Sequence, residues 1–324
     1  MSKFLTLKFE AIMPLLPEVK DFLQQYQQLP TLNQLSPQDA RKLAAMGYKL
    51  NPNRQVKVAE ISERLLPNYP VPVALRIYTP SGTPPFPVVV YLHGGGWVLG
   101  NLEMADGTCR ILCKQAQCVV VSVDYRLGPE NKFPAGVEDA YAATLWASRH
   151  ADQLRGNPQQ LAIAGDSAGA NLAAVVALMA RDRGEFSLIH QLLIYPVTNY
   201  ANDTPSYLEY AVGYGLTPED MVWFWQHYLP HPEAGNSPLV SPLQAEFLGG
   251  LPPASIYTVE YDILRSEAEI YAAKLQQAGV NVFHKCYPGL IHGFLGVPIL
   301  TPVTNPILLE IAENLEQALR KHHP

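Results

Sequence analysis

The stretch from residue 88 to residue 204 most constrains the fold, because it is nearly free of proline and alternates apolar runs with helical segments. Of the 29 prolines, twelve precede residue 90 and eight lie between Pro205 and Pro253, but only four fall within this stretch. Proline cannot donate to a sheet ladder and breaks helix interiors. We therefore expect the regular core of the protein here.

The order of the expected elements predicts an α/β fold. The expected strands are 56–63, 73–79, 88–93, 118–124, 161–165, 189–195, 254–260 and 281–287. The expected helices between and after them are about 104–116, 136–149, 168–182, 265–278 and 305–320. Apolar strands separated by helices are typical of a mostly parallel sheet that is covered on both faces. We predict such a sheet with eight strands, in which 56–63 and 73–79 form a half-buried antiparallel pair at the N-terminal edge.

Two further segments have helical patterns but no place in the sheet. The first, residues 1–50, has a helix N-cap at Ser36. The second, residues 200–235, holds a helix that begins after the cap Thr217 with Pro218 in its first position. This helix is apolar on more than one side, through Met221, Trp223, Phe224, Trp225 and Tyr228. It suits a core helix and a lid over an aromatic-walled site equally well.

The pentapeptide Gly165-Asp166-Ser167-Ala168-Gly169 lies between an expected strand and an expected helix. A serine in this place sits on a tight turn at the carboxyl end of a strand, where flanking glycines avoid collisions. The following helix N-terminus offers backbone N–H groups, including that of Ala168, to an anion. The pattern predicts Ser167 as an exposed nucleophile.

A second motif, His93-Gly94-Gly95-Gly96-Trp97, follows strand 88–93 directly. Three glycines let backbone amides turn inward, so two N–H groups of this loop and that of Ala168 would form an oxyanion hole. The glycines, with Asp124, also imitate a dinucleotide-binding fingerprint. However, Asp124 lies 30 residues after Gly94, whereas about 20 are expected. The bulk of Trp97 and the roughly ninety residues before the strand also argue against a nucleotide.

The base and the acid should follow the serine in the chain. His292 stands in a loop just past strand 281–287, near the expected place of Ser167, whereas His190 and His284 lie inside strands. Asp262 follows strand 254–260 directly, with Glu260 as a weaker choice. A lone aspartate there would more often cap a helix, but beside Ser167 and His292 it would orient the imidazole and stabilise the imidazolium. The remaining histidines belong to the lid segment or the chain end: His227, His231, His322 and His323.

Composition excludes several partners. Charged residues make up 16% of the chain, against about 25% in a typical domain. The net charge is −6, and the 23 basic residues are scattered. Without a basic stripe we expect no nucleic acid partner. No run of about 18 apolar residues could span a membrane, and Lys8, Glu10 and Pro14 interrupt any secretory signal.

The four cysteines do not suggest a disulfide framework in a chain of this size. Cys109 and Cys113 lie four residues apart, and Cys118 begins an apolar strand. A metal site would need a second close pair or a Cys/His cluster, so we expect no metal and interpret the thiols as reduced and packed. These features predict a cytoplasmic protein.

Five blocks now appear in one order: HGGGW (93–97), DYRLGPENKFPA (124–135), GDSAGAN (165–171), YDILRSE (261–267) and LIHGF (290–294). Together they resemble the hormone-sensitive-lipase-like carboxylesterases of the bacterial type, within the α/β-hydrolase superfamily. The resemblance implies Ser167, Asp262 and His292 as the catalytic triad and Gly95, Gly96 and Ala168 as the oxyanion hole. It also implies a helical cap from 1–50 and 200–235 around a core of 51–199 and 236–324. Arg126 and Glu130, within the second block, are expected to form ion pairs.

The sequence departs from the family pattern at a few positions. The family commonly has Asp-Pro-Leu-Arg-Asp at the catalytic acid. In this chain Ile263 replaces the proline and Ser266 replaces the second aspartate. We expect a serine carboxylesterase that hydrolyses small esters through an acyl-enzyme, without a cofactor. The resemblance implies esters with short to medium acyl chains. The alternatives are an amidase or lactonase with the same triad, or a non-catalytic binding relative. The sequence leaves monomer and homodimer open.

Overall fold

A computed structural model describes residues 14–48, 50–67 and 69–321, and its centre is one eight-stranded sheet in the order β1-β2-β4-β3-β5-β6-β7-β8. The strands are β1 (Glu60–Leu65), β2 (Ala74–Thr79), β3 (Phe86–Leu92), β4 (Val119–Asp124), β5 (Gly156–Asp166), β6 (His190–Ile194), β7 (Ala254–Tyr261) and β8 (Val282–Ile291). The pairs β1–β2 and β2–β4 are antiparallel, and all other neighbours are parallel. The predicted sheet and its antiparallel edge are confirmed.

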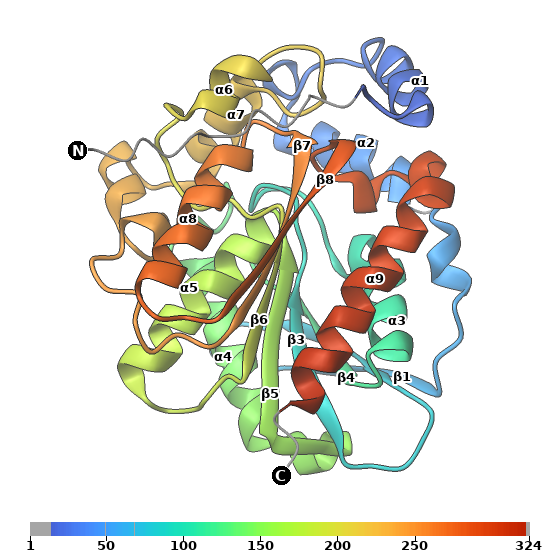
Figure 1. The fold of residues 1–324 in the computed structure, drawn as a ribbon, viewed down its shortest axis with the longest axis vertical. Coiled ribbons are helices and arrows are strands. Elements are labelled where there is room, and N and C mark those ends of the chain that lie inside the picture. The colour runs from blue at the N-terminus through green and yellow to red at the C-terminus, as the bar shows by residue number, and fades with distance from the viewer. Residues whose placement is uncertain (1–13, 49, 68, 322–324) are drawn as a thin grey trace, which may run out of the picture.

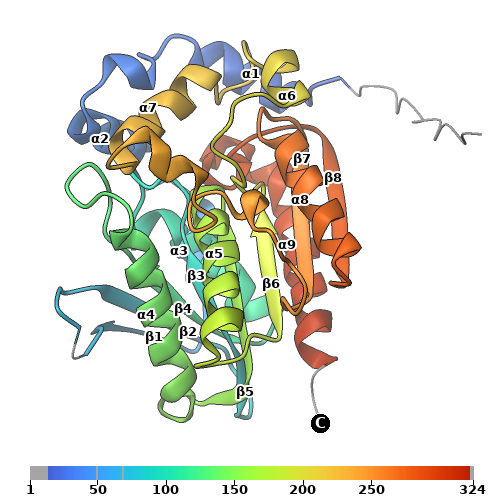
Figure 2. The same cartoon turned by 90° about the vertical axis from the view of Figure 1, so that its left-hand side faces the viewer.

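Helices cover both faces of this sheet. One face carries α4 (Ala135–Arg149), α5 (Ala168–Arg183) and α8 (Arg265–Gln277), and the other carries α3 (Leu102–Gln115) and α9 (Thr301–Arg320) (Figures 1 and 2). The valines of β3 and β4 are completely buried as a result, which explains their unbroken apolar runs.

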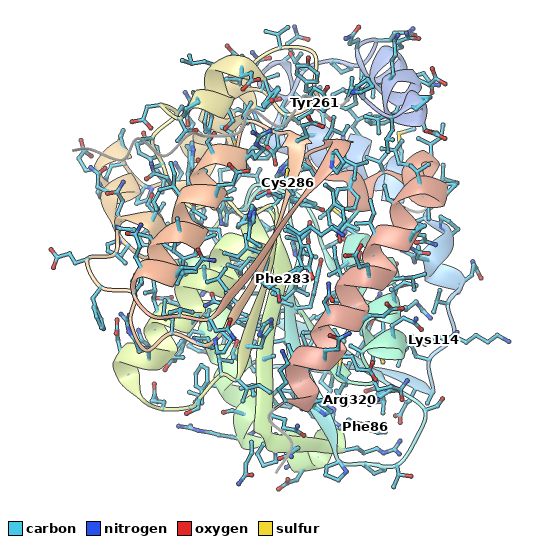
Figure 3. All side chains as sticks on the ribbon, viewed as in Figure 1. Phe86, Lys114, Tyr261, Phe283, Cys286 and Arg320 are labelled. Atoms are coloured by element: carbon cyan, nitrogen blue, oxygen red, sulfur yellow. The ribbon has the colours of Figure 1, made fainter. Side chains whose placement is uncertain are left out.

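Four shorter helices lie together beyond the carboxyl ends of the parallel strands, at the top of both views (Figures 1 and 2). They are α1 (Pro17–Tyr26), α2 (Pro37–Tyr48), α6 (Pro205–Glu209) and α7 (Pro218–Tyr228). Figure 3 labels Phe283 and Cys286 on β8 and Tyr261 at the end of β7. Of these three residues, Tyr261 lies nearest to the four helices. Two segments that are distant in the sequence therefore cover the same end of the sheet.

Several predicted details differ in the structure. Strand β1 was expected to be half-buried, but five of its six residues are exposed because it lies at the outer edge of the sheet. Strand β8 continues beyond 287 to Ile291, through Pro288 and Gly289, as an edge strand can. Helix α9 begins at Thr301 rather than about 305 and continues through Pro306. Helix α6 was not predicted.

Candidate active site

Ser167 lies on a tight turn between the end of β5 and the start of α5, as predicted. Its backbone is strained, with φ 53° and ψ −119°. The flanking glycines are sterically required, because a Cβ on Gly165 would collide with the backbone of Gly169, and one on Gly169 would collide with the Leu92 carbonyl. The Ser167 N–H donates to the Ile194 carbonyl oxygen at 2.9 Å, which anchors the turn to β6.

Ser167, His292 and Asp262 form a continuous chain of contacts. Ser167 Oγ lies 2.8 Å from His292 Nε2, and His292 Nδ1 lies 2.7 Å from Asp262 Oδ2. The other carboxylate oxygen, Oδ1, accepts a hydrogen bond from the Leu264 N–H at 2.9 Å. Asp262 is only 2% exposed, so its charge acts on the imidazole with little screening by water. The structure brings together the three residues predicted from the sequence.

The alternative side chains have other partners. Glu260 Oε2 accepts a hydrogen bond from the Gly289 N–H at 2.8 Å. His190 Nε2 lies 3.0 Å from Ser255 Oγ, and His284 Nε2 lies 2.9 Å from Thr258 Oγ1. His227 Nδ1 lies 2.8 Å from the Trp223 carbonyl oxygen on α7, and His231 Nδ1 lies 3.1 Å from Glu233 Oε2. His322 and His323 lie outside the described residues.

The glycine loop after β3 turns toward Ser167. Gly95 and Gly96 have positive φ values of 111° and 58° and line the same cavity as Ser167. The Gly94 N–H donates to Asp166 Oδ1 at 3.0 Å, and Tyr91 Oη donates to the same oxygen at 2.7 Å. Asp166 therefore ties the glycine loop to the serine turn.

Packing on the far side of this loop argues further against a bound nucleotide. Trp97 is 1% exposed, and its ring stacks on Tyr228 of α7 at a centroid distance of 4.5 Å and an interplanar angle of 8°. The N-terminus of the following helix α3 is capped internally, since the Met104 N–H donates to Asn101 Oδ1 at 3.1 Å. One of the helix N–H groups that could bind a pyrophosphate is thus already occupied.

A cavity of about 240 Å³ opens above Ser167. From α1 and α7 it is lined by Phe22, Tyr26, Asp220, Met221 and Phe224. From the core it is lined by Tyr91, His93, Met104, Thr108, Asp166 and Leu295, together with the glycine loop and His292. Burial lowers the pKa of His93 to about 4, so its ring is neutral at ordinary pH. The catalytic groups therefore face a small pocket that is mainly apolar.

The chain is also similar to proteins that are already known. Residues 89–296 match the family described as alpha/beta hydrolase fold. The carboxylic ester hydrolase LipN of Mycobacterium tuberculosis is 41% identical over 252 residues, which are 76% of this chain and 67% of that protein. The chain belongs to the hormone-sensitive-lipase-like family of α/β hydrolases.

Other members of the family match over most of their length. An arylesterase of Saccharolobus solfataricus is 36% identical over 293 residues, 88% of this chain and 94% of that protein. Among solved structures, a hyperthermophilic esterase from the archaeon Pyrobaculum calidifontis is similar with a TM-score of 0.90 and 40% identity, covering 94% of this chain and 99% of that one. A thermostable esterase from Pseudomonas putida has a TM-score of 0.89 and 36% identity, with 96% and 99% coverage.

Two charged residues of the family block 124–135 are structural in this chain, as expected. Arg126 forms an ion pair of 2.8 Å with the fully buried Asp139. Glu130 pairs at 2.7 Å with Arg41 of α2, whose Nη2 also donates to the Gly128 carbonyl oxygen. The contacts of Arg41 attach α2 to the hydrolase core.

Sequence reasoning missed several residues of the pocket. Phe22 and Tyr26 reach it from α1, far from the other lining residues in the sequence. Tyr195, which follows β6, packs on His292 although nothing in its surroundings distinguishes it in the sequence. A hint existed for Met221 and Phe224, since the helix around them is apolar on more than one side. In the structure one side of α7 lines the pocket, while Trp225 and Tyr228 pack on Trp97.

Two kinds of feature are absent from residues 14–48, 50–67 and 69–321. Over these ranges no group of three or more His, Cys, Asp or Glu side chains is placed to hold a metal ion. Within the same part of the chain, no helix is long and apolar enough to cross a membrane. All four cysteines are free thiols, and Cys109, Cys113 and Cys118 are buried.

Proposed function

We propose that this chain is a serine carboxylesterase that hydrolyses short- to medium-chain esters through an acyl-enzyme. The observation that carries the proposal is the chain of contacts from Ser167 Oγ through His292 to Asp262 at the floor of a pocket. The relatives named as carboxylic ester hydrolase, arylesterase and esterase support the same reaction.

In the first half of the reaction Ser167 Oγ attacks the ester carbonyl carbon. His292 Nε2, 2.8 Å away, takes the hydroxyl proton as general base. Asp262 accepts the Nδ1–H bond, which fixes the tautomer and stabilises the imidazolium that forms. The backbone N–H groups of Gly95, Gly96 and Ala168 are assigned to the carbonyl oxygen as its charge develops.

In the second half the alcohol leaves and water hydrolyses the acyl-enzyme. His292 gives its proton to the departing alcohol oxygen, so that the C–O bond breaks and the acyl group stays on Ser167. His292 then removes a proton from a water molecule that attacks the acyl-enzyme, and the carboxylic acid leaves as Ser167 regains its proton.

The pocket supports the proposed substrate size. Pockets for drug-sized ligands measure about 300–1,000 Å³, whereas this cavity measures about 240 Å³. A cavity of this size favours a short or medium acyl chain with a small alcohol over a triglyceride. We further propose that residues 1–50 and 200–235, which contain α1, α2, α6 and α7, form a cap on the pocket. The core then consists of 51–199 and 236–324. Residues 1–13 lie outside the described part. The free thiols support a reducing compartment such as the cytoplasm.

Hydrolysis of p-nitrophenyl butyrate by the wild type and by Ser167→Ala tests this proposal. We expect wild-type turnover far above background and a loss of at least about a thousandfold in the variant. A p-nitrophenyl phosphonate should label Ser167 covalently, as peptide mass spectrometry would show. Absence of wild-type turnover, or equal turnover in both proteins, would overturn the proposal.

A further inference from the structure

The walls of the catalytic pocket carry negative charge without a matching cation. Two carboxylate residues line it, Asp166 beside the nucleophile and Asp220 on α7. No lysine or arginine occurs among the residues of 14–48, 50–67 and 69–321 that line the cavity. A low-dielectric pocket of one sign attracts substrates of the opposite sign and repels those of its own sign.

Asp220 is held in place as a carboxylate by backbone groups. It is 6% exposed, and the Thr217 N–H donates to its Oδ2 at 3.0 Å. Burial raises the pKa of Asp220 above its ordinary value, and hydrogen bonds with Thr217 and with the backbone of Leu32 offset only part of this rise. These donors bind the ionised form but bring no full positive charge. The first turn of α7 therefore holds the Asp220 carboxylate in place, but no described side chain of opposite charge neutralises it.

Aromatic rings surround the same part of the pocket. Phe22 and Tyr26 of α1 lie with their ring centroids 5.6 Å apart, and Phe224 of α7 lines the wall with them. Burial raises the pKa of the Tyr26 hydroxyl, and the charge of Asp220 raises it further, which places the two groups within electrostatic reach. Ring faces beside a carboxylate are the surroundings that proteins use to bind alkylammonium groups.

A second carboxylate lines the pocket, that of Asp166, and burial raises its pKa. Asp166 lines the cavity next to Ser167, and its Oδ1 already accepts hydrogen bonds from Tyr91 and from the Gly94 N–H. An ester that carries a carboxylate would therefore meet two carboxylate side chains in the pocket, and no described lysine or arginine lines it to compensate for the lost hydration of the ester.

We infer that the pocket selects esters by charge, accepting neutral and ammonium-bearing esters and rejecting those with a carboxylate, and that Asp220 is a specificity-determining residue. This inference rests on the proposed esterase function. The recognised group is an alkylammonium on the non-reacting part of the substrate, held between the Asp220 carboxylate and the rings of Phe22, Tyr26 and Phe224.

Three methyl esters of matched length test the inference in a pH-stat assay at low salt. The first carries a terminal trimethylammonium group on a butyrate chain, the second has a tert-butyl group in its place, and the third is the monomethyl ester of glutarate. The wild-type kcat/KM should favour the cationic ester over the anionic ester on the order of a hundredfold, and added salt should reduce this ratio.

Asp220→Asn and Glu219→Gln provide the decisive comparison. The amide oxygen introduced by Asp220→Asn would still accept a hydrogen bond from the Thr217 N–H, but the charge would be removed, and the cation-to-anion ratio should fall about tenfold. Glu219 precedes Asp220 on the same helix turn and its charge acts on Asp220, but it is exposed to screening water and does not line the cavity, so Glu219→Gln removes the same charge and should change the ratio by less than about twofold. Equal ratios in Asp220→Asn and Glu219→Gln, or a wild-type ratio near one, would overturn the inference. If the neutral ester itself is not hydrolysed, the proposed function fails instead.

Discussion

Tyr195 packs against the ring of His292, with centroids 4.8 Å apart and an interplanar angle of 62°. Its backbone is strained, because its φ of 37° lies in the left-handed region that a bulky side chain rarely adopts. The same ring contacts Phe294 at 5.5 Å and is 1% exposed. The imidazole is thus held by a ring contact in addition to its contacts with Ser167 and Asp262.

Removing this support should slow catalysis without weakening substrate binding. We expect Tyr195→Ala to lower kcat about tenfold or more with little change in KM, because His292 could then rotate away from Ser167. Tyr195→Phe keeps the ring and should retain activity within about threefold. Steady-state kinetics on p-nitrophenyl butyrate measure both. If Tyr195→Ala matches the wild type in kcat, the ring has no positioning role.

Two histidines on neighbouring elements provide a matched test of the general base. His292→Ala should lose about a thousandfold or more in kcat/KM, because Ser167 would lack a proton acceptor. His284, on β8, contacts Thr258 and should tolerate the same exchange with a loss of only a few-fold. Circular dichroism would verify that both variants fold. An inactive His284→Ala with native spectra would contradict the assignment.

Much of the active site could be predicted because its groups lie at strand ends with local patterns. Gly165 and Gly169 mark a turn where a Cβ would collide with backbone, and such a requirement is visible in the sequence itself. Asp262 and His292 follow the apolar strands β7 and β8 directly. The family blocks in their order added to this local evidence.

The rest depended on contacts between distant segments, which no local pattern encodes. Phe22 reaches the pocket only because α1 folds over the ends of β7 and β8, more than two hundred residues later in the chain (Figure 1). Tyr195 follows an apolar strand like an ordinary continuation, so its positive φ could not be foreseen. Alternating polarity in β1 indicated burial, but its edge position leaves it exposed.

The close approach at Gly169 predicts a large loss of stability. In Gly169→Ala the new Cβ would collide with the Leu92 carbonyl, so α5 and β3 would have to separate. We expect a decrease of about 3 kcal/mol or more in the free energy of unfolding, measured by urea denaturation.

Gly47→Ala is the matched control for this exchange. Gly47 lies in helix α2, and a Cβ there would meet nothing within 4 Å. Alanine should therefore stabilise the helix by about 0.5–1 kcal/mol. Similar changes in both variants would show that the spacing between α5 and β3 adapts to a methyl group.

Glu267 predicts a pH dependence of stability that can be isolated in one variant. It is fully buried, and its Oε1 accepts hydrogen bonds from the N–H groups of Thr198 and Asn199 at 2.6 and 3.1 Å. Burial raises the pKa of this carboxyl to about 8. The unfolded chain releases the proton near its ordinary value of about 4.3. The stability from this group is thus complete below that value and is lost as the pH rises through about 8.

Glu267→Gln should remove this slope, because the amide oxygen can accept the same two hydrogen bonds and the side chain does not titrate. We expect the free energy of unfolding of the variant, relative to wild type, to rise by a few kcal/mol between about pH 5 and pH 8 and to level off above. Glu246→Gln, at an exposed position, reports the effect of removing a surface carboxylate. Urea denaturation across this pH range measures the free energy of unfolding of both proteins. If it depends on pH in the same way in Glu267→Gln and in the wild type, Glu267 keeps its charge in the folded protein.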